Sequence, residues 1–181
     1  MLLVRKFKGF KMFITFEGID GSGKSTQISL LCNELERRGL PFILTRQPGG
    51  TEIGAKIRQI LLDPENSAMD PKAELLLYLA DRVQHLQEVI RPALAEGKLV
   101  LCDRYHDATL AYQGAGRGLD LSWMEELSKD LILTPDLTIW MELDPKCIWK
   151  VRVSNGFNDL FIHGGGCHLP SLAQFFNGLV V

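Results

Sequence analysis

Short apolar runs alternate with longer segments of helical periodicity between Phe13 and Leu143. The apolar runs predict four strands, at Phe13–Phe16, Phe42–Thr45, Leu99–Asp103 and Asp136–Leu143. Between them, apolar residues recur three or four positions apart, as on one face of a helix. Strands that alternate with helices favour a parallel sheet with helical crossovers, which is an α/β fold.

The predicted helices have recognisable ends. Asp70 precedes Pro71, which is typical of an N-cap followed by proline in the first turn. Ser122 and Glu125 have the spacing of a capping box, so we expect a helix to begin at Ser122. The other predicted helices are Lys24–Arg38, which Gly39 ends, and Glu52–Leu62. A long helix is predicted from Pro71 to Ile90, with a kink at Pro92 and an end of the segment at Gly97. A further helix is predicted at Tyr105–Gln113, and the glycines that follow break it.

Composition and charge exclude some classes of protein. The 181 residues are 46% hydrophobic and 23% charged, as expected for one globular domain with a core. A net charge of −2 gives no electrostatic footprint for nucleic acid or an anionic membrane, and no apolar run reaches membrane-spanning length. Four cysteines lie scattered without paired spacing, which favours free thiols and a reducing cytoplasm.

The two ends of the chain differ from its centre. Residues 1–11 are basic but lack the features of a signal peptide, so we expect a disordered extension before a folded domain at 12–150. Of the 42 acidic and basic residues, only Arg152 and Asp159 fall in 151–181. We expect this tail to lack a strong strand. It is either a divergent edge element of the fold or a frameshifted end, and we hypothesise that the chain beyond about residue 146 is out of frame relative to its ancestor. Leu172, Phe175, Phe176 and Leu179 could form one short helical face there.

The segment Gly18–Ser25 matches the phosphate-binding pattern GxxxxGK[ST] and lies between a predicted strand and a predicted helix. Glycines let the backbone wrap around phosphates, while loop amides and the helix N-terminus supply positive potential. Lys24 adds a mobile positive charge, and the Ser25 hydroxyl suits Mg²⁺. A glycine-rich turn before an ordinary helix is the alternative interpretation, and the full motif in this context disfavours it.

Further candidate residues follow the other predicted strands. Asp103 closes the third strand, so its carboxylate is expected beside the phosphate loop with a role toward Mg²⁺, directly or through water. Arg46 and Arg104 each follow a strand and are expected at the same sheet edge. Arginine forks match phosphate oxygens, so two such arginines suggest a second phosphate-bearing ligand, although either one alone could be an ordinary surface residue.

These motifs together resemble the thymidylate kinase family. The matching stretches are FITFEGIDGSGKSTQ, TRQPGGTEIGAKIR, LLYLADRVQH, DRYHDATLAYQGAGRGL and PDLTIWMELDP, in family order from about Phe13 to Pro145. The resemblance implies a P-loop three-layer fold with a parallel sheet flanked by helices, a homodimer, and phosphoryl transfer from ATP to dTMP with Mg²⁺.

The resemblance also implies a role for individual residues. It places ATP at Gly18, Asp20, Gly21, Ser22, Gly23, Lys24, Ser25 and Thr26. It places dTMP at Asp20, Arg46, Tyr78, Arg82, Arg104, Tyr105, Thr109 and Gln113, with Tyr78 stacking on the base and Asp20 near the sugar 3′-OH. Lys24, Arg104 and Asp103 are the implied catalytic residues, and Ser25 and Asp103 the implied Mg²⁺ site.

The chain departs from the family pattern in three places. Gln47 stands where a glutamate is usual, and Ala108 where a serine is common. The phosphate loop has no arginine, and family members of that kind take one from a lid that has no clear counterpart in this chain. Two alternatives therefore stay open: a nucleotide-binding protein with little or no kinase activity, and a kinase for another nucleotide.

A metal site in the tail is a weaker possibility. His163, Cys167 and His168 lie within six residues of one another, but their spacing is not that of a closed metal site. We therefore expect no metal there.

Overall fold

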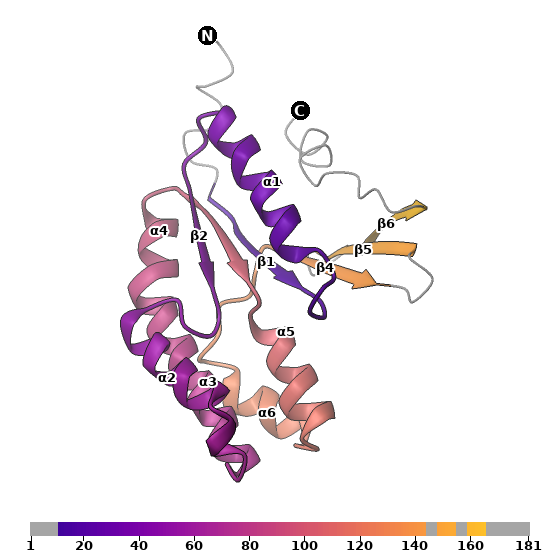
Figure 1. Cartoon of the computed structure of the whole chain (residues 1–181). Coiled ribbons are helices and arrows are strands. Elements are labelled where there is room, and N and C mark those ends of the chain that lie inside the picture. The colour runs from indigo at the N-terminus through magenta and orange to yellow at the C-terminus, as the bar shows by residue number, and fades with distance from the viewer. Residues whose placement is uncertain (1–10, 144–147, 155–158, 166–181) are drawn as a thin grey trace. The chain divides into compact units, whose positions relative to one another are not determined.

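The computed structural model describes residues 11–143, 148–154 and 159–165, with side chains up to Met141 (Figure 1). The predicted N-terminal extension falls almost wholly outside these residues. The helical face from Leu172 to Leu179, together with Cys167 and His168, also lies outside them. The described chain forms two compact units.

The first unit contains the residues up to Leu44, Ala93–Asp103, and the chain from Pro135 on. The strands are β1 (Phe13–Glu17), β2 (Phe42–Arg46), β3 (Leu99–Asp103), β4 (Leu137–Leu143), β5 (Ile148–Ser154) and β6 (Asp159–Gly165), in the sheet order β2-β3-β1-β4-β5-β6. β1 pairs in parallel with both β3 and β4. The four strands predicted from apolar runs are confirmed, as is the α/β class.

The core of the first unit explains why these runs are strands. All five residues of β1 are buried, as expected for a central strand of a parallel sheet. Helix α1 (Lys24–Arg37) places Ile28, Leu31 and Leu35 against apolar residues of β1, β3 and β4. The predicted spacing of apolar residues on this helix therefore corresponds to its buried face.

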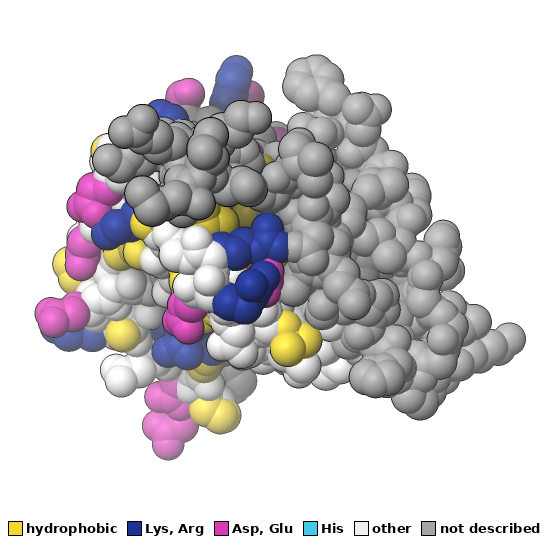
Figure 2. All heavy atoms as spheres, turned by 90° about the horizontal axis from the view of Figure 1, so that it is seen from above, with side chains coloured by type: hydrophobic (Ala, Val, Ile, Leu, Met, Phe, Trp, Pro, Cys, Tyr) yellow, Lys and Arg dark blue, Asp and Glu magenta, His cyan; other side chains and the backbone are white. Residues whose placement is uncertain are grey.

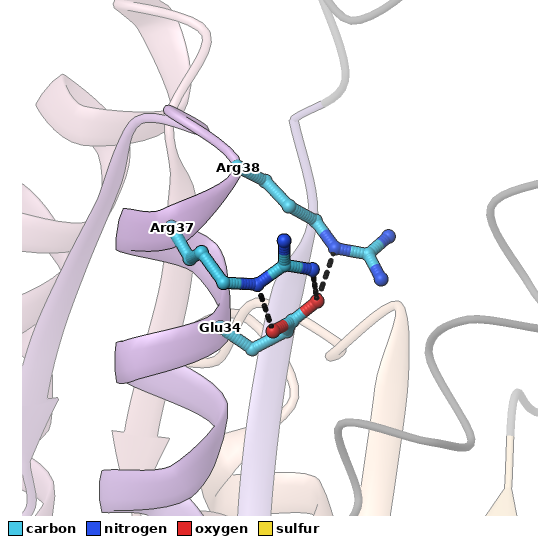
Figure 3. Close-up of polar contacts among 3 residues, drawn as sticks. All are labelled: Glu34, Arg37 and Arg38. Carbon is cyan, nitrogen blue, oxygen red and sulfur yellow. Dashed lines mark hydrogen bonds and ion pairs between the residues drawn. The ribbon is translucent and has the colours of Figure 1, made fainter.

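The end of α1 has a C-cap and a charged cluster. Gly39 adopts a φ of 66°, and its N–H and that of Leu40 donate to the last helical carbonyls. On the helix surface, Glu34 accepts two hydrogen bonds from Arg37 and one from Arg38 (Figure 3). These bonds lower the pKa of Glu34 to about 2.

The second unit contains Thr45–Pro92 and Arg104–Thr134 and is mainly helical. Leu75, Leu79 and Met124 form its apolar core, with partly buried leucines around them. Its elements are α2 (Glu52–Leu62), η1 (Pro64–Asn66), α3 (Pro71–His85), η2 (Leu86–Ile90), α5 (His106–Thr109), η3 (Leu110–Gly116) and α6 (Leu121–Ser128); α4 (Arg91–Ala95) follows η2 and leads back to β3.

The long predicted helix changes its hydrogen-bond pattern before Pro92. The segment η2 is π-helical, and the Arg91 N–H bonds to the Leu86 carbonyl five residues earlier. Proline has no N–H and cannot continue the usual i→i−4 pattern, so a local widening at this point has a clear cause. The helix continues beyond Pro92 to Ala95.

The predicted start of α6 is wrong by one residue, and its cap is a different one. Asp120 is the N-cap, and its Oδ1 accepts from the Trp123 N–H at 2.7 Å. The helix begins at Leu121, so Ser122 lies inside its first turn. Asp and Ser are comparable N-caps, and local spacing alone did not separate them.

The tail contains two strands where we expected none. β5 pairs antiparallel with both β4 and β6. In β5, Trp149, Val151 and Val153 alternate with Lys150, Arg152 and Ser154, which is the period of a half-buried strand. That alternation was the missed signal, because the low charge of the tail as a whole drew attention away from it.

Surface and sulfur chemistry complete the description. Acidic and basic side chains are interspersed on the described surface in the view of Figure 2. Cys32 and Cys102 form no disulfide bond within the described residues, and Cys102 is buried. Among the described helices, none has the length and apolar character needed to cross a membrane.

Candidate functional site

The phosphate loop begins where β1 ends, and three of its glycines have positive φ. These are Gly18 at 138°, Gly21 at 79° and Gly23 at 88°, the last being the N-cap of α1. A Cβ on Gly18 would collide with the Met141 carbonyl oxygen in β4. Gly18 is therefore needed both for its backbone conformation and for close approach to the neighbouring strand.

Lys24 folds back over this loop. Its residue is only 7% exposed, and Nζ donates to the Gly18 carbonyl at 2.9 Å and to the Ile19 carbonyl at 2.8 Å. The ammonium charge is thus held within the loop, next to the backbone that the motif assigns to phosphate. By contrast, Asp20, Ser25 and Thr26 are exposed.

Ser22 occupies the middle of the loop. It is fully buried, and its Oγ has no hydrogen-bond partner among the residues that the structure describes. A buried hydroxyl is rarely left in that state, so an added acceptor or donor near it would be favourable.

Asp103 lies at the carboxyl end of β3, in register with Phe16 of β1 and so close to the start of the loop. Its Oδ1 is buried and has no partner in the described part of the chain. A buried carboxylate oxygen without a donor fits a nearby cation or an ordered water. Among the described residues, no cluster of three or more His, Cys, Asp or Glu side chains could hold a metal ion.

In the second unit, Arg82 contacts two of the other predicted dTMP residues. Its guanidinium is fully buried and donates to Thr109 Oγ1 at 2.7 Å and to the Tyr105 carbonyl at 3.1 Å. It also lies over the Tyr105 ring, 5.1 Å from the centroid. Three predicted positions, Arg82, Tyr105 and Thr109, therefore form one network.

Gln47 and His106 complete this network. Arg82 Nε donates to Gln47 Oε1 at 3.0 Å, and Nη1 lies 2.9 Å from His106 Nδ1. A guanidinium can only donate, so Nδ1 must accept and the imidazole must be neutral. Burial, followed by the charge of Arg82, lowers the pKa of His106 to about 4, which agrees with that assignment.

A second cluster surrounds Glu74 on α3. Gln113 Nε2 donates to Glu74 Oε1 at 3.1 Å, and Arg117 Nε forms an ion pair with Oε2 at 2.9 Å. Tyr78 lies one turn further along α3. Its pKa is raised mainly by burial and then by the Glu74 carboxylate.

Arg104 has an unusual backbone. Its φ of 68° is the only positive value of a non-glycine residue within the described chain. Such conformations are rare for residues with a side chain and concentrate at functional sites. The Arg104 guanidinium lies 5.8 Å from the centroid of the Tyr112 ring, while Arg46 is exposed at the end of β2.

Three residues that we did not single out from the sequence hold the loop after Arg46. Asp81 Oδ1 accepts from the Gly49 N–H at 2.9 Å, and Arg58 Nη1 donates to the Pro48 carbonyl at 2.9 Å. Thr51 caps α2 through a bond from the Gly54 N–H. The Gln47–Pro48 peptide bond in this loop is cis. The Asp81–Gly49 bond joins residues 32 positions apart, so no local pattern indicates it, whereas the Thr51 cap is a local contact within one of the quoted motifs.

A family model described as thymidylate kinase matches residues 16–154. The chain belongs to the thymidylate kinase family. Its match extends beyond Pro145, where the resemblance of motifs ended, into β5.

Individual relatives of similar sequence carry the same family name. A thymidylate kinase of Solidesulfovibrio magneticus is 54% identical over 136 residues, covering 74% of this chain and 65% of that protein. One from Syntrophotalea carbinolica is 62% identical over 117 residues, covering 65% of this chain and 54% of the relative. A crystal structure of thymidylate kinase from Ehrlichia chaffeensis is 43% identical with a TM-score of 0.69, covering 74% of this chain and 77% of that one. The chain thus spans less than two thirds of the length of the first two relatives.

Proposed function

We propose that the protein transfers a phosphate from ATP to dTMP, giving ADP and dTDP. The observation that carries this proposal is the membership of the thymidylate kinase family over residues 16–154. Two features support the proposal. The P-loop with its buried lysine, in the first unit, suits the phosphate donor ATP. The network around Arg82, in the second unit, suits the acceptor dTMP.

On the donor side, Lys24 and the amides of Gly18, Gly21, Ser22 and Gly23 would hold the ATP phosphates, with Thr26 beside them. Lys24 would exchange its two carbonyl acceptors for phosphate oxygens. Ser25 and Asp103 would hold Mg²⁺, directly or through water, and the orphaned Oδ1 of Asp103 supports that assignment. When bound, Mg²⁺ supplies positive charge that neutralises the phosphate oxygens.

On the acceptor side, Arg46 and Arg104 would bind the dTMP phosphate, and the backbone of Arg104 supports a functional role. Tyr78 would stack on the base. Arg82, Tyr105, Thr109 and Gln113 would shape the rest of the pocket, with Asp20 near the sugar. Arg82 would position neighbouring groups as well as contact the base, because four of its contacts are to the protein itself.

The reaction requires little more than position and charge. The second pKa of a phosphate monoester is about 6, so the acceptor is mostly a dianion at neutral pH. It needs no strong general base, and Lys24 and Arg104 would stabilise charge on the transferring group.

A coupled assay for ADP release tests the proposal, with dTMP, dUMP and dCMP as acceptors and Mg²⁺ present. We expect saturable release with dTMP and a lower kcat/KM with the other two. A preference for dUMP or dCMP would favour a kinase for another nucleotide. ADP release that does not depend on any acceptor would contradict kinase activity.

The second candidate is a nucleotide-binding protein with little turnover. It is favoured by the absence of an arginine between Asp20 and Lys24, and by the antiparallel pair β5–β6 where the resemblance leads us to expect a lid. An arginine of this kind can contribute about 10³–10⁵ in rate. Binding of ATP and dTMP by calorimetry without ADP release would favour this candidate, and activity gained by grafting a family lid after Pro145 would establish its cause.

We also propose a homodimer in the cytoplasm. The dimer rests on the family resemblance. The reduced state of Cys32 and Cys102, which form no disulfide bond within the described residues, supports a reducing compartment. Sedimentation at several concentrations would test the dimer.

A further inference from the structure

His85 lies at the end of α3 and contacts the segment at the end of β2. The residue is fully buried, and its Nε2 lies 2.6 Å from Thr45 Oγ1, at hydrogen-bond distance. Burial lowers the pKa of His85, so the imidazole is neutral at pH 7 and one of the two groups donates to the other. Because Thr45 directly precedes Arg46, this bond lies one residue from a proposed ligand of the acceptor phosphate.

The same imidazole limits the space at Gly50. A Cβ added to Gly50 would come within 2.5 Å of His85 Nε2 and within 2.8 Å of the Arg46 carbonyl oxygen. Only glycine leaves room for both groups at this point. His85 therefore lies close to the main chain of Arg46 and contacts the segment on either side of it, at Thr45 and at Gly50.

Asp81 holds the other end of this segment. It is fully buried on α3, and its Oδ1 accepts from the Gly49 N–H at 2.9 Å. Asp81 and His85 are four residues apart and share a face of the helix, so this face binds the chain at Thr45 and again at Gly49. Arg46 lies between the two contacts and is itself exposed. Its main chain is thus held in place while its guanidinium stays available to a ligand.

The polar atoms of this arrangement indicate a role beyond stability. His85 Nδ1 and Asp81 Oδ2 are buried and have no hydrogen-bond partner among the residues that the structure describes. A buried polar atom without a partner lowers the free energy of unfolding, and an apolar side chain at either position would not carry that cost. Such departures from good packing are typical of functional sites.

We propose that His85 is a positioning residue: by bonding to Thr45 and packing against Gly50, it fixes the main chain of Arg46 where the guanidinium reaches the acceptor phosphate. This inference rests on the proposed function, in which Arg46 binds the phosphate of dTMP. A misplacement of about 1 Å in a group that holds a substrate can cost about 10²-fold. We expect a smaller loss when the His85–Thr45 bond is removed, because the bond from Gly49 to Asp81 remains.

Substitutions at both ends of the bond can remove it. Thr45→Val removes the hydroxyl with little change of shape, whereas Thr45→Ser keeps a hydroxyl at this position. His85→Leu removes the imidazole instead. Ser128→Ala is the matched control, because the Ser128 hydroxyl is also buried in the second unit but donates within α6, to the Met124 carbonyl.

The test is calorimetric binding of dTMP to the full chain and to each variant, alone and combined with Arg46→Met. As single changes, we expect Thr45→Val and His85→Leu to weaken dTMP binding by about five- to tenfold, and Thr45→Ser and Ser128→Ala by less than about twofold. Combined with Arg46→Met, Thr45→Val and His85→Leu should each cost less than about twofold more, because the residue that they position is gone. A merely structural role would give the same loss with and without Arg46, and that result, or no loss from the single changes, would overturn the inference.

Thermal unfolding first shows that each variant is folded. Thr45→Val covers the case in which His85→Leu does not fold, since Thr45 is only half-buried. Failure of the proposed function has a different signature, because the unsubstituted protein would then not bind dTMP, and this inference would fall with it. Normal binding of dTMP with additive losses in the combined variants would overturn this inference alone.

Discussion

Lys24 is the residue on which the donor site depends most. Its ammonium is buried against the Gly18 and Ile19 carbonyls, where no aliphatic group can replace it. We expect Lys24→Met to reduce kcat for ADP formation by about 10²–10³, the usual loss when a charge that stabilises the transition state is removed. The measurement is the coupled ADP assay.

Lys98 provides the matched control. It forms a surface ion pair with Glu96, and such pairs contribute little. Lys98→Met should leave kcat unchanged within about twofold. Equal activity of the two variants would contradict the role of Lys24.

His106 makes stability depend on pH. Its pKa of about 4 lies below the ordinary value of 6.5, so the unfolded chain takes up the proton first as pH falls. Stability is therefore fully present above about pH 6.5 and is lost as the pH falls toward 4. We expect this contribution to be about 2 kcal/mol, after discounting for partial exposure.

Urea unfolding at pH 7 and pH 4.5 measures this contribution. His106→Gln keeps an acceptor for Arg82 but cannot titrate, so it should lose about 2 kcal/mol less than the unsubstituted protein over that interval. His85 still titrates in the variant, since burial also lowers its pKa, and a residual slope remains. Identical pH dependence of the two proteins would contradict the assignment.

The candidate residues were predictable, but their partners were not. Arg82, Tyr105 and Thr109 could be named from motifs, because each motif is local in sequence. Their mutual hydrogen bonds join residues 23 to 27 positions apart, and no local pattern encodes such distances. Glu74 and Tyr112 were missed for the same reason: each looks like an ordinary helical residue until the contacts with Arg117 and Arg104 are known.

At the scale of elements, the cap of α6 can be tested directly. Asp120→Ala removes the acceptor of the Trp123 N–H and should lower the free energy of unfolding by about 1 kcal/mol. Ser122→Ala serves as the control, because Ser122 lies inside the helix and should change stability by less than about 0.5 kcal/mol. The measurement is the free energy of unfolding of both variants by denaturant. A larger loss for Ser122→Ala would restore the capping box that we first expected.

The junction of the P-loop with β4 gives a second prediction for an element. In Gly18→Ala, the new methyl group meets the Met141 carbonyl oxygen at a φ of 138°, so β1, the loop and β4 cannot keep their packing. We expect a loss of about 2–4 kcal/mol in the free energy of unfolding. Gly116→Ala is the control, since its nearest contact is the Ala111 carbonyl at 3.7 Å. A Gly18→Ala protein as stable as the control would show that this close approach is not essential.

The elements were predicted well where burial is one-sided or complete. β3 and α2 have the predicted ends, because apolar runs and helical spacing report burial directly. β5 and β6 were missed because the tail was assessed by its composition, although β5 alternates with a period of two. The segment before Pro92 is π-helical, which follows from the missing N–H of the proline, while the kink itself stays a prediction.

At the scale of the whole molecule, family membership and completeness are separate questions. Residues 16–154 match the family model, whereas the chain spans 65% of the Solidesulfovibrio relative and 54% of the Syntrophotalea relative. Under the proposed function, binding of ATP and dTMP would depend on residues within the matched region. Turnover would depend in addition on the catalytic arginine that the resemblance leads us to expect in a lid, so binding and catalysis can be separated experimentally.

The central claim is that phosphate passes from ATP to dTMP on this chain. The most direct measurement is transfer of label from γ-labelled ATP in the presence of dTMP and Mg²⁺, with products separated by chromatography. The account predicts label in dTDP, formed in equal amount to ADP and at least about a hundredfold more slowly with Lys24→Met. Label that appears only in inorganic phosphate, or no transfer although calorimetry shows that both nucleotides bind, would contradict it.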